Sequence, residues 1–265
     1  MKRFPSCLRI AIALILGVGS VGGMVAYADV GVPFNGWLQL NSGYAQVPYQ
    51  DEINLTPANG SFTIEGWIKN PSFTDLQNDA IYKKSSFKLG FKHDENIFPL
   101  PGHSTYSVLF WACSPATGGE WCFARSGHVL SDCVGSYCPP QGWFHFAYVY
   151  NQATGKGSLF WNGRMLGADE SIPNVSMEPI ALHSATSMDE FRISNSARYT
   201  ATFTPASAPF ECDGNTQALW HFNEIAGTTT FHDVCGTVDN MLVGYNGAHT
   251  EGVPGSWVYL PLVVR

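Results

Sequence analysis

Charged residues are scarce in this chain of 265 residues, since Asp, Glu, Lys and Arg make up only 13% of it. No stretch has the pattern of an amphipathic helix of three turns, and no short repeat period is present. Cys-x-x-Cys and His-x-x-x-His spacings are absent, which argues against a zinc site. The chain is nevertheless 45% hydrophobic and 14% aromatic, which excludes disorder, coiled coil and collagen. These features favour one β-rich domain with a substantial core.

The first residues have the pattern of an export signal. Lys2, Arg3 and Arg9 precede an apolar run at 10–25, and the small residues of 26–28 suit a signal peptidase. The run is shorter than the roughly 20 residues that span a bilayer, so cleavage is favoured over an uncleaved membrane anchor. We therefore expect residues 1–28 to be a signal peptide, and the mature protein to be secreted or displayed at the cell surface with no stable membrane insertion.

The acidic balance bears on the partners of the mature chain. The whole chain has a formal net charge of −7, and removal of residues 1–28, which contain three bases and no acid, leaves 11 bases against 21 acids. Nucleic acid and anionic membranes would be repelled by such a protein. Neither is expected as a partner.

The cysteine count supports the same compartment. Cleavage would remove Cys7 from the seven cysteines and leave an even number, which in an exported protein indicates disulfides. The sequence alone allows several connectivities. We predict local pairs, namely Cys113 with Cys122, Cys133 with Cys138, and Cys212 with Cys235.

The periodicity of the mature chain is that of β-strands. In SFTIEGWIK (61–69), Phe62, Ile64 and Ile68 fall on one face, and the intervening polar residues fall on the other. Asn162-Gly163 is a strong two-residue hairpin signal. Further runs with a strand pattern are 80–84, 87–92, 106–112, 143–150, 157–162, 188–194 and 217–223. The sequence therefore predicts an all-β, two-sheet antiparallel sandwich.

Two segments depart from this rhythm. Residues 113–142 are rich in Gly, Pro and Cys, and we expect a long loop stapled by disulfides. Residues 253–265 form a short apolar tail, expected either to end as a strand against the sandwich, to be disordered, or to act in surface sorting. The domain itself is predicted to span residues 29–252.

Four stretches resemble the laminin-G-like, concanavalin A-like jelly-roll family that is common among exported bacterial proteins. They cover its opening strands, its W-H hairpin, its "DEvRIsnvARy" strand and its "aLWhFdE" segment, and lie at 35–69, 142–167, 187–205 and 218–247. The likeness extends over residues 34–250. It implies a jelly-roll sandwich. The insertion at 113–142 has no counterpart in the family pattern, and Cys235 stands where serine is common.

The resemblance also implies a structural calcium ion. In MDEFRIS, Phe191 and Ile193 predict that Asp189 faces inward, whereas Glu190 and Arg192 would form an ion pair on the other face. The corresponding Asp of related folds often helps to bind Ca²⁺, and the proposed ligand set is Asp189, Asn223 and Glu224. The alternative is that Asp189 accepts backbone N–H bonds at a turn.

Catalysis has little support in the sequence. A glycoside hydrolase needs two carboxylates on one face, yet the single Glu-x-Asp pattern is Glu211-Cys-Asp213, beside a Pro-rich turn. We therefore expect no enzyme, but a lectin-like module that binds carbohydrate or a cell-surface protein. Its candidate contacts are Trp121, Arg125 and Tyr137 in the insertion, because aromatics on a rigid loop offer flat apolar faces at low entropic cost. The alternatives are a structural or adhesive surface protein without a small ligand, and then a glycosidase.

Overall fold

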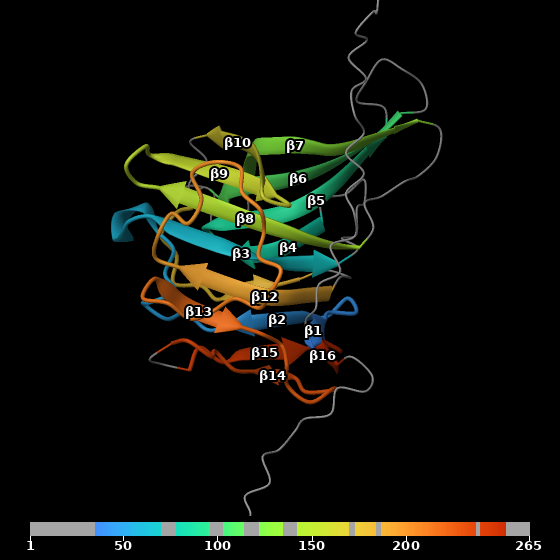
Figure 1. The fold of residues 1–265 in the computed structure, drawn as a ribbon, viewed down its shortest axis with the longest axis vertical. Helices are drawn as coiled ribbons and strands as arrows, with labels where there is room; N and C mark the ends of the chain where they lie inside the picture. Colours follow the sequence, from blue (N-terminus) through green and yellow to red (C-terminus); the bar gives the residue numbers. More distant parts are fainter. Residues whose placement is uncertain are drawn as a thin grey trace, which may run out of the picture.

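The computed structural model contains two antiparallel sheets that form a sandwich (Figure 1). The structure describes residues 35–69, 78–95, 103–113, 122–134, 142–169, 173–183, 187–236 and 239–252. Among these residues there is no α-helix, only the short 3-10 turn η1 (Pro57–Asn59), and no helix long and apolar enough to cross a membrane. The predicted fold class is confirmed.

The first sheet contains eight strands. Its order is β10 (Arg164–Asp169), β9 (Lys156–Trp161), β8 (Trp143–Asn151), β3 (Phe62–Lys69), β12 (Ser187–Ser194), β1 (Gly36–Gln39) and β16 (His249–Gly252), with β13 (Thr216–Trp220) also paired to β12. The second sheet also contains eight, in the order β14 (Thr230–Phe231), β15 (Leu242–Tyr245), β2 (Tyr44–Val47), β11 (Ile180–Leu182), β4 (Asn78–Lys83), β5 (Phe87–Glu95), β6 (His103–Cys113) and β7 (Cys122–Val134).

The period-two pattern explains the core between the sheets. Phe62, Ile64 and Ile68 of β3 point into one large apolar cluster, as predicted, and meet side chains such as Phe87 and Phe110 from the second sheet. The Phe110 and Tyr148 rings stack across the sandwich at 3.6 Å between centroids. Burial of this apolar surface is the main source of stability, at about 25 cal/mol per Å².

The outer face of the first sheet is covered as well. The connection between β12 and β13, residues 195–215, crosses in front of β3, β8 and β9, where it is drawn in orange (Figure 1). Its Tyr199 and Phe203 pack against Phe160, and its Phe210 packs against Trp67. Both faces of β3 are therefore buried, although only one of them is apolar in sequence.

The hairpin between β9 and β10 forms where Asn162-Gly163 predicts it. Both residues have positive φ, 46° and 72°, as a type I′ turn requires. A Cβ at Gly163 would also collide with the backbone oxygen of Phe203, so the β12–β13 connection needs glycine here. The turn thus helps to seat the connection on the sheet.

The segment 113–142 is not the loop that we expected. Residues 122–134 form β7, which pairs with β6 along its whole length. The pairing places the backbone of Cys113 opposite Cys122. Cys138 lies outside the described residues, as do the predicted signal peptide and the tail.

Candidate functional site

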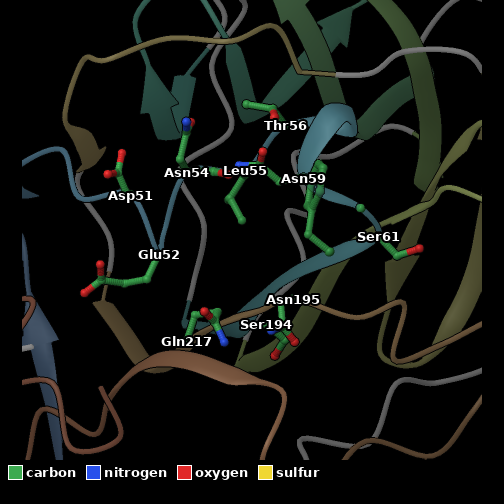
Figure 2. Close-up of a pocket in the computed structure, with 12 residues that line it drawn as sticks. Asp51, Glu52, Asn54, Leu55, Thr56, Asn59, Ser61, Ser194, Asn195 and Gln217 are labelled. Atoms are coloured by element: carbon green, nitrogen blue, oxygen red, sulfur yellow. Dashed lines mark hydrogen bonds between the residues drawn. The ribbon is translucent and has the colours of Figure 1, made fainter. Parts of the chain in front are cut away.

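A cavity of about 200 Å³ opens at one end of the sandwich. Its walls come from the loop between β2 and β3, the end of β12 and the start of β13 (Figure 2). Gln217, Ser194 and Asn195 lie on the side opposite Leu55 and Thr56 (Figure 2). The remaining lining is mostly polar and consists of Asp51, Glu52, Asn54, Asn59, Gly60, Ser61 and Phe62. The cavity thus offers amide, hydroxyl and carboxylate groups around a small volume.

The β2–β3 loop is held in place by its backbone conformation and by hydrogen bonds. Pro57 begins the 3-10 turn, where its fixed φ is favourable, and Gly60 ends it with φ of 112°, a value that side chains disfavour. Asn59 Nδ2 donates to the Asn54 backbone oxygen at 3.0 Å, and the Gln152 backbone N–H donates to Ser61 Oγ at 3.0 Å. This cavity wall is therefore preorganised.

Hydrogen bonds also connect the rim of the cavity to a buried lysine. Tyr49 OH donates to Asp51 Oδ1 at 2.7 Å, and Asn54 Nδ2 donates to Tyr49 OH at 3.2 Å. The bond to Asp51 raises the pKa of Tyr49. On the other side of the amide, Lys83 Nζ donates to Asn54 Oδ1 at 3.4 Å. Burial lowers the pKa of Lys83 to about 8.

A second polar cluster lies between the first sheet and the β12–β13 connection. Glu65, which is 0% exposed, accepts two hydrogen bonds from Arg192 at Oε1, and its Oε2 accepts one from Tyr199 OH at 2.7 Å. His145 Nε2 lies 3.2 Å from the same Oε2. Although burial opposes ionisation, these partners together hold the pKa of Glu65 below its usual value.

This cluster resembles catalytic machinery in composition, but not in accessibility. Glu65 and His145 are both fully buried, and the rings of Phe203 and Phe210 flank the imidazole. A substrate would have to displace the β12–β13 connection to reach them. The cluster therefore fastens that connection to the sheet through hydrogen bonds.

The predicted inward orientation of Asp189 in MDEFRIS is wrong. A register shift lies between Asp189 and Arg192, and Glu190 has φ of 52°. Met188 and Phe191 both join the core, so the strict alternation breaks between them. Asp189 instead lies opposite Trp67, whose ring packs on the outer face.

The bulge also changes the ion pairs. Arg192 pairs with Glu65, as described above, and not with Glu190. Glu190 accepts the backbone N–H of Phe210 at 2.7 Å, and its Oε1 lies 2.7 Å from His221 Nδ1. Glu190 therefore anchors the far end of the β12–β13 connection.

Two of the three proposed calcium ligands, Asp189 and Glu224, accept hydrogen bonds from the backbone. Asp189 is 1% exposed, and burial together with the Glu190 charge raises its pKa well above the usual value. Its Oδ1 accepts the Glu190 N–H at 2.8 Å, as the alternative interpretation expected of a turn, and its buried Oδ2 has no hydrogen-bond partner. Asn223 is exposed, and Glu224 Oε1 accepts the His232 N–H.

The side chains that commonly ligate metals, those of His, Cys, Asp and Glu, do not gather in the described residues. The described part of the chain brings together no group of three or more His, Cys, Asp or Glu side chains able to hold a metal ion. Calcium binding remains a prediction from the resemblance.

The predicted contact residues in the insertion lie mostly outside the described structure. Trp121 and Tyr137 fall in the ranges 114–121 and 135–141, which are not described. Arg125 lies on β7, where the pairing with β6 shifts register between Ala124 and Ser126. The arrangement of these side chains stays a prediction.

The Glu-x-Asp pattern is used for structure. Arg198 donates two hydrogen bonds to Asp213, at 2.9 and 2.8 Å, and holds the pKa of that carboxyl below its usual range. Asp213 also accepts the Asn215 N–H, while Glu211 is exposed to solvent. Asp213 caps the turn before β13, so it is committed to local hydrogen bonds.

Comparison with known proteins supports the fold alone. No protein family model matches the chain, and no curated protein sequence matches it significantly. A putative carbohydrate-binding protein from Bacteroides ovatus has a similar structure, with a TM-score of 0.54 and 15% identity, over 83% of this chain and 60% of that one. This chain thus corresponds to only part of that protein.

Two more distant matches were also found. A heptameric SAP-like pentraxin from Limulus polyphemus has a TM-score of 0.35, with 11% identity over 62% of this chain and 78% of that one. A polysaccharide lyase of family 18 has a TM-score of 0.27, with 9% identity over 61% and 72% of the two chains. Both are too distant to support an argument. The chain is a jelly-roll-like β-sandwich with a polar cavity at one end.

Proposed function

We propose that this protein is an exported, non-catalytic module that binds carbohydrate in the cavity at the end of its sandwich. The observation that carries the proposal is the lining of that cavity, where Asn195 and Gln217 face the β2–β3 loop (Figure 2). Sugars carry many hydroxyl groups, and amide side chains can both donate to and accept from them. The fold likeness to a putative carbohydrate-binding protein agrees with this proposal.

The volume of the cavity limits the size of the ligand that can bind there. Sites for drug-sized molecules enclose roughly 300 to 1,000 Å³. At about 200 Å³, this cavity suits one sugar unit, such as the end of a glycan chain. The insertion residues Trp121, Arg125 and Tyr137 remain candidates for a second contact region.

Export is supported by the disulfide between Cys212 and Cys235. Structural disulfides persist in oxidising compartments and are rare in the cytosol. Together with the N-terminal pattern, this bond is the reason that we place the protein outside the cytosol.

The absence of catalysis is proposed because acids in the described core are already engaged. Glu65 is buried beneath the β12–β13 connection and accepts a hydrogen bond from Tyr199. Glu190 accepts the Phe210 N–H, and Asp213 accepts hydrogen bonds from Arg198. None of the three lines the cavity in which we propose that the sugar binds. The mature protein should release no reducing ends from polysaccharides. Release that disappears in Glu190→Gln would identify an enzyme instead.

A glycan array on the mature protein tests the binding proposal, followed by calorimetry with the best glycan. We expect Asn195→Ala and Gln217→Ala each to weaken binding at least tenfold while leaving the melting temperature nearly unchanged. Gln46→Ala is the control, because Gln46 lies on β2 and does not line the cavity. Trp121→Ala and Tyr137→Ala measure how much the insertion contributes to glycan binding. Binding that is lost only in the insertion variants would move the site there, and no glycan binding at all would favour an adhesive protein.

A further inference from the structure

Lys83 is an unusual side chain for the interior of a β-sandwich. It lies at the end of β4, opposite Ile180 of β11 and Phe87 of β5, and is 2% exposed. Ile180 and Phe87 both belong to the core, so Lys83 stands in an inward-facing register. Among the described residues, no carboxylate forms an ion pair with it. A buried cation without a counter-ion is costly, and its retention calls for an explanation.

The Lys83 ammonium group contacts the β2–β3 loop. Its Nζ donates to Asn54 Oδ1 at 3.4 Å and lies 5.5 Å from the centre of the Tyr49 ring. Figure 2 shows the Asn54 side chain directed away from Gln217, so its amide faces away from the cavity that its residue helps to line. Lys83 therefore contacts the back of the cavity wall.

A chain of hydrogen bonds continues from this contact to the rim. Asn54 donates to Tyr49 OH, and Tyr49 donates to Asp51 Oδ1, at 3.2 and 2.7 Å. Each acceptor in the chain is thereby fixed by the donor before it. Hydrogen bonds in series polarise one another, and a charged donor at the start strengthens them most.

We propose that Lys83 is a positioning residue for the cavity, whose charged ammonium orients Asn54, Tyr49 and Asp51 so that loss of its proton weakens sugar binding. The inference rests on the proposed function for its ligand, but the hydrogen-bonded chain itself is testable without one. The weakening has two causes. A neutral amine is a poorer donor to Asn54, and it loses the attraction of a cation for the Tyr49 ring.

Other ionisable groups surround this chain. The loop contributes Tyr49, Asp51 and Glu52, and the turn after β4 contributes Lys84. Lys88 of β5 pairs with Asp79 of β4 at 2.9 Å. Burial alone lowers the pKa of Lys83 to about 8, so its proton is lost in mildly alkaline solution. Lys83→Met removes that titration and leaves every other group in place.

The first experiment needs no ligand. Side-chain NMR signals of Lys83 and Asn54 are followed in the mature protein from pH 6 to 10. We expect the Asn54 amide signals to shift with the same midpoint as the Lys83 amine, near pH 8. In Lys83→Met this shift should vanish, while Lys84→Met, which removes an exposed lysine one residue away, should retain it. Asn54 signals that ignore the Lys83 titration would overturn the inference.

The second experiment measures binding of the best glycan from the array by calorimetry at pH 7 and pH 9. We expect wild type and Lys84→Met to bind at least fivefold more weakly at pH 9, and Lys83→Met to bind weakly at both values. Tyr49→Phe keeps the ring beside Lys83 but breaks the chain, and should bind weakly without changing the Lys83 midpoint. Full-strength binding by Lys83→Met would refute the positioning role. If no glycan binds wild type, the proposed function fails and the NMR result alone decides this inference.

Discussion

Arg192 and Glu65 form the central polar contact of the first sheet. Arg192 Nε and one terminal nitrogen both donate to Glu65 Oε1, at 2.9 and 2.7 Å, across the neighbouring strands β12 and β3. Tyr199, from the β12–β13 connection, donates to the other oxygen. One carboxylate thus joins two strands and the segment that covers them.

We expect Glu65→Gln to lower the free energy of unfolding by about 3 to 5 kcal/mol, because Arg192 would keep a buried charge without its counter-ion. Chemical denaturation at pH 7 measures this change. Asp213→Asn is the control, since its pair with Arg198 is partly exposed, and it should cost less than about 1 kcal/mol. Equal effects of the two variants would contradict the central role of Glu65.

The buried pair also sets a response to acid. The folded pKa of Glu65 lies below its unfolded value, so the stability it contributes is present at neutral pH and is lost as the pH falls through the folded pKa. Wild type should therefore lose stability steeply below pH 4.5, and Glu65→Gln should show a shallower decline. Parallel pH profiles of the two proteins would show that Glu65 does not titrate in this way.

Asp189 is expected to act in the opposite direction. Its folded pKa is raised, so its contribution is largest in acid and decreases as the pH rises from 3.8 towards the folded pKa. Asp189→Asn resembles the neutral acid in shape and should be at least as stable as wild type at pH 7. Denaturation curves at pH 4 and pH 7 measure the difference. A strongly destabilised variant at pH 7 would mean that the ionised form is needed.

The same variant tests calcium. If Asp189 is a ligand, excess Ca²⁺ raises the melting temperature of wild type by mass action, and Asp189→Asn abolishes the rise. The resemblance of this strand to the jelly-roll family predicts such a rise. A wild-type melting temperature that is indifferent to both Ca²⁺ and a chelator would refute the calcium prediction.

Lys83 adds a separate contribution at alkaline pH. Its pKa is lower in the folded chain, at about 8 against 10.5, so the unfolded chain binds more protons between these values and stability rises with pH. One pKa unit corresponds to about 1.4 kcal/mol, so Lys83→Met should gain roughly 3 kcal/mol over wild type at pH 7. Thermal denaturation at pH 7 and pH 10 should show the gain shrinking. A gain equally large at pH 10 would not come from the amine.

The sequence predicted strand faces and turns well where these depend on residues that are close together in the chain. Phe62, Ile64 and Ile68 define the core face of β3 by alternation alone, and Asn162-Gly163 defines a turn by its own backbone preferences. The strand β7 was missed because Gly, Pro and Cys around it indicated a loop, whereas its long pairing with β6 supplies its structure.

The sites depend on contacts that no local pattern contains. The partners of Glu65 lie 127 and 134 residues away in sequence, at Arg192 and Tyr199, and become neighbours only through strand order. The cavity joins residues 51–62 to Asn195 and Gln217 in the same way. The signal available in the sequence was the polar run of the β2–β3 loop, but nothing local places it opposite β13.

The ion pair predicted between Glu190 and Arg192 failed for another reason. It assumed regular alternation, and the bulge marked by the positive φ of Glu190 shifts the strand by one residue. A bulge turns side chains relative to the regular pleat. Glycine often marks a bulge in a sequence, but this strand contains none.

The disulfide between Cys212 and Cys235 confirms one predicted pair and allows a quantitative test. It ties the end of the β12–β13 connection to the turn after β14, at a sequence separation of 23 residues. A closure of about this length is expected to contribute about 3 kcal/mol by restricting the unfolded chain. Cys212→Ala/Cys235→Ala should lose about that much in chemical denaturation while keeping the Glu65 contacts, which hold the middle of the same connection. An unchanged unfolding free energy in the double variant would show that the β12–β13 connection is held by its buried polar contacts alone.

Peptide mapping without reduction tests all three predicted disulfides. It should find the bond between Cys212 and Cys235, together with Cys113–Cys122 and Cys133–Cys138. A link between Cys122 and Cys133 would exclude both of the latter pairs.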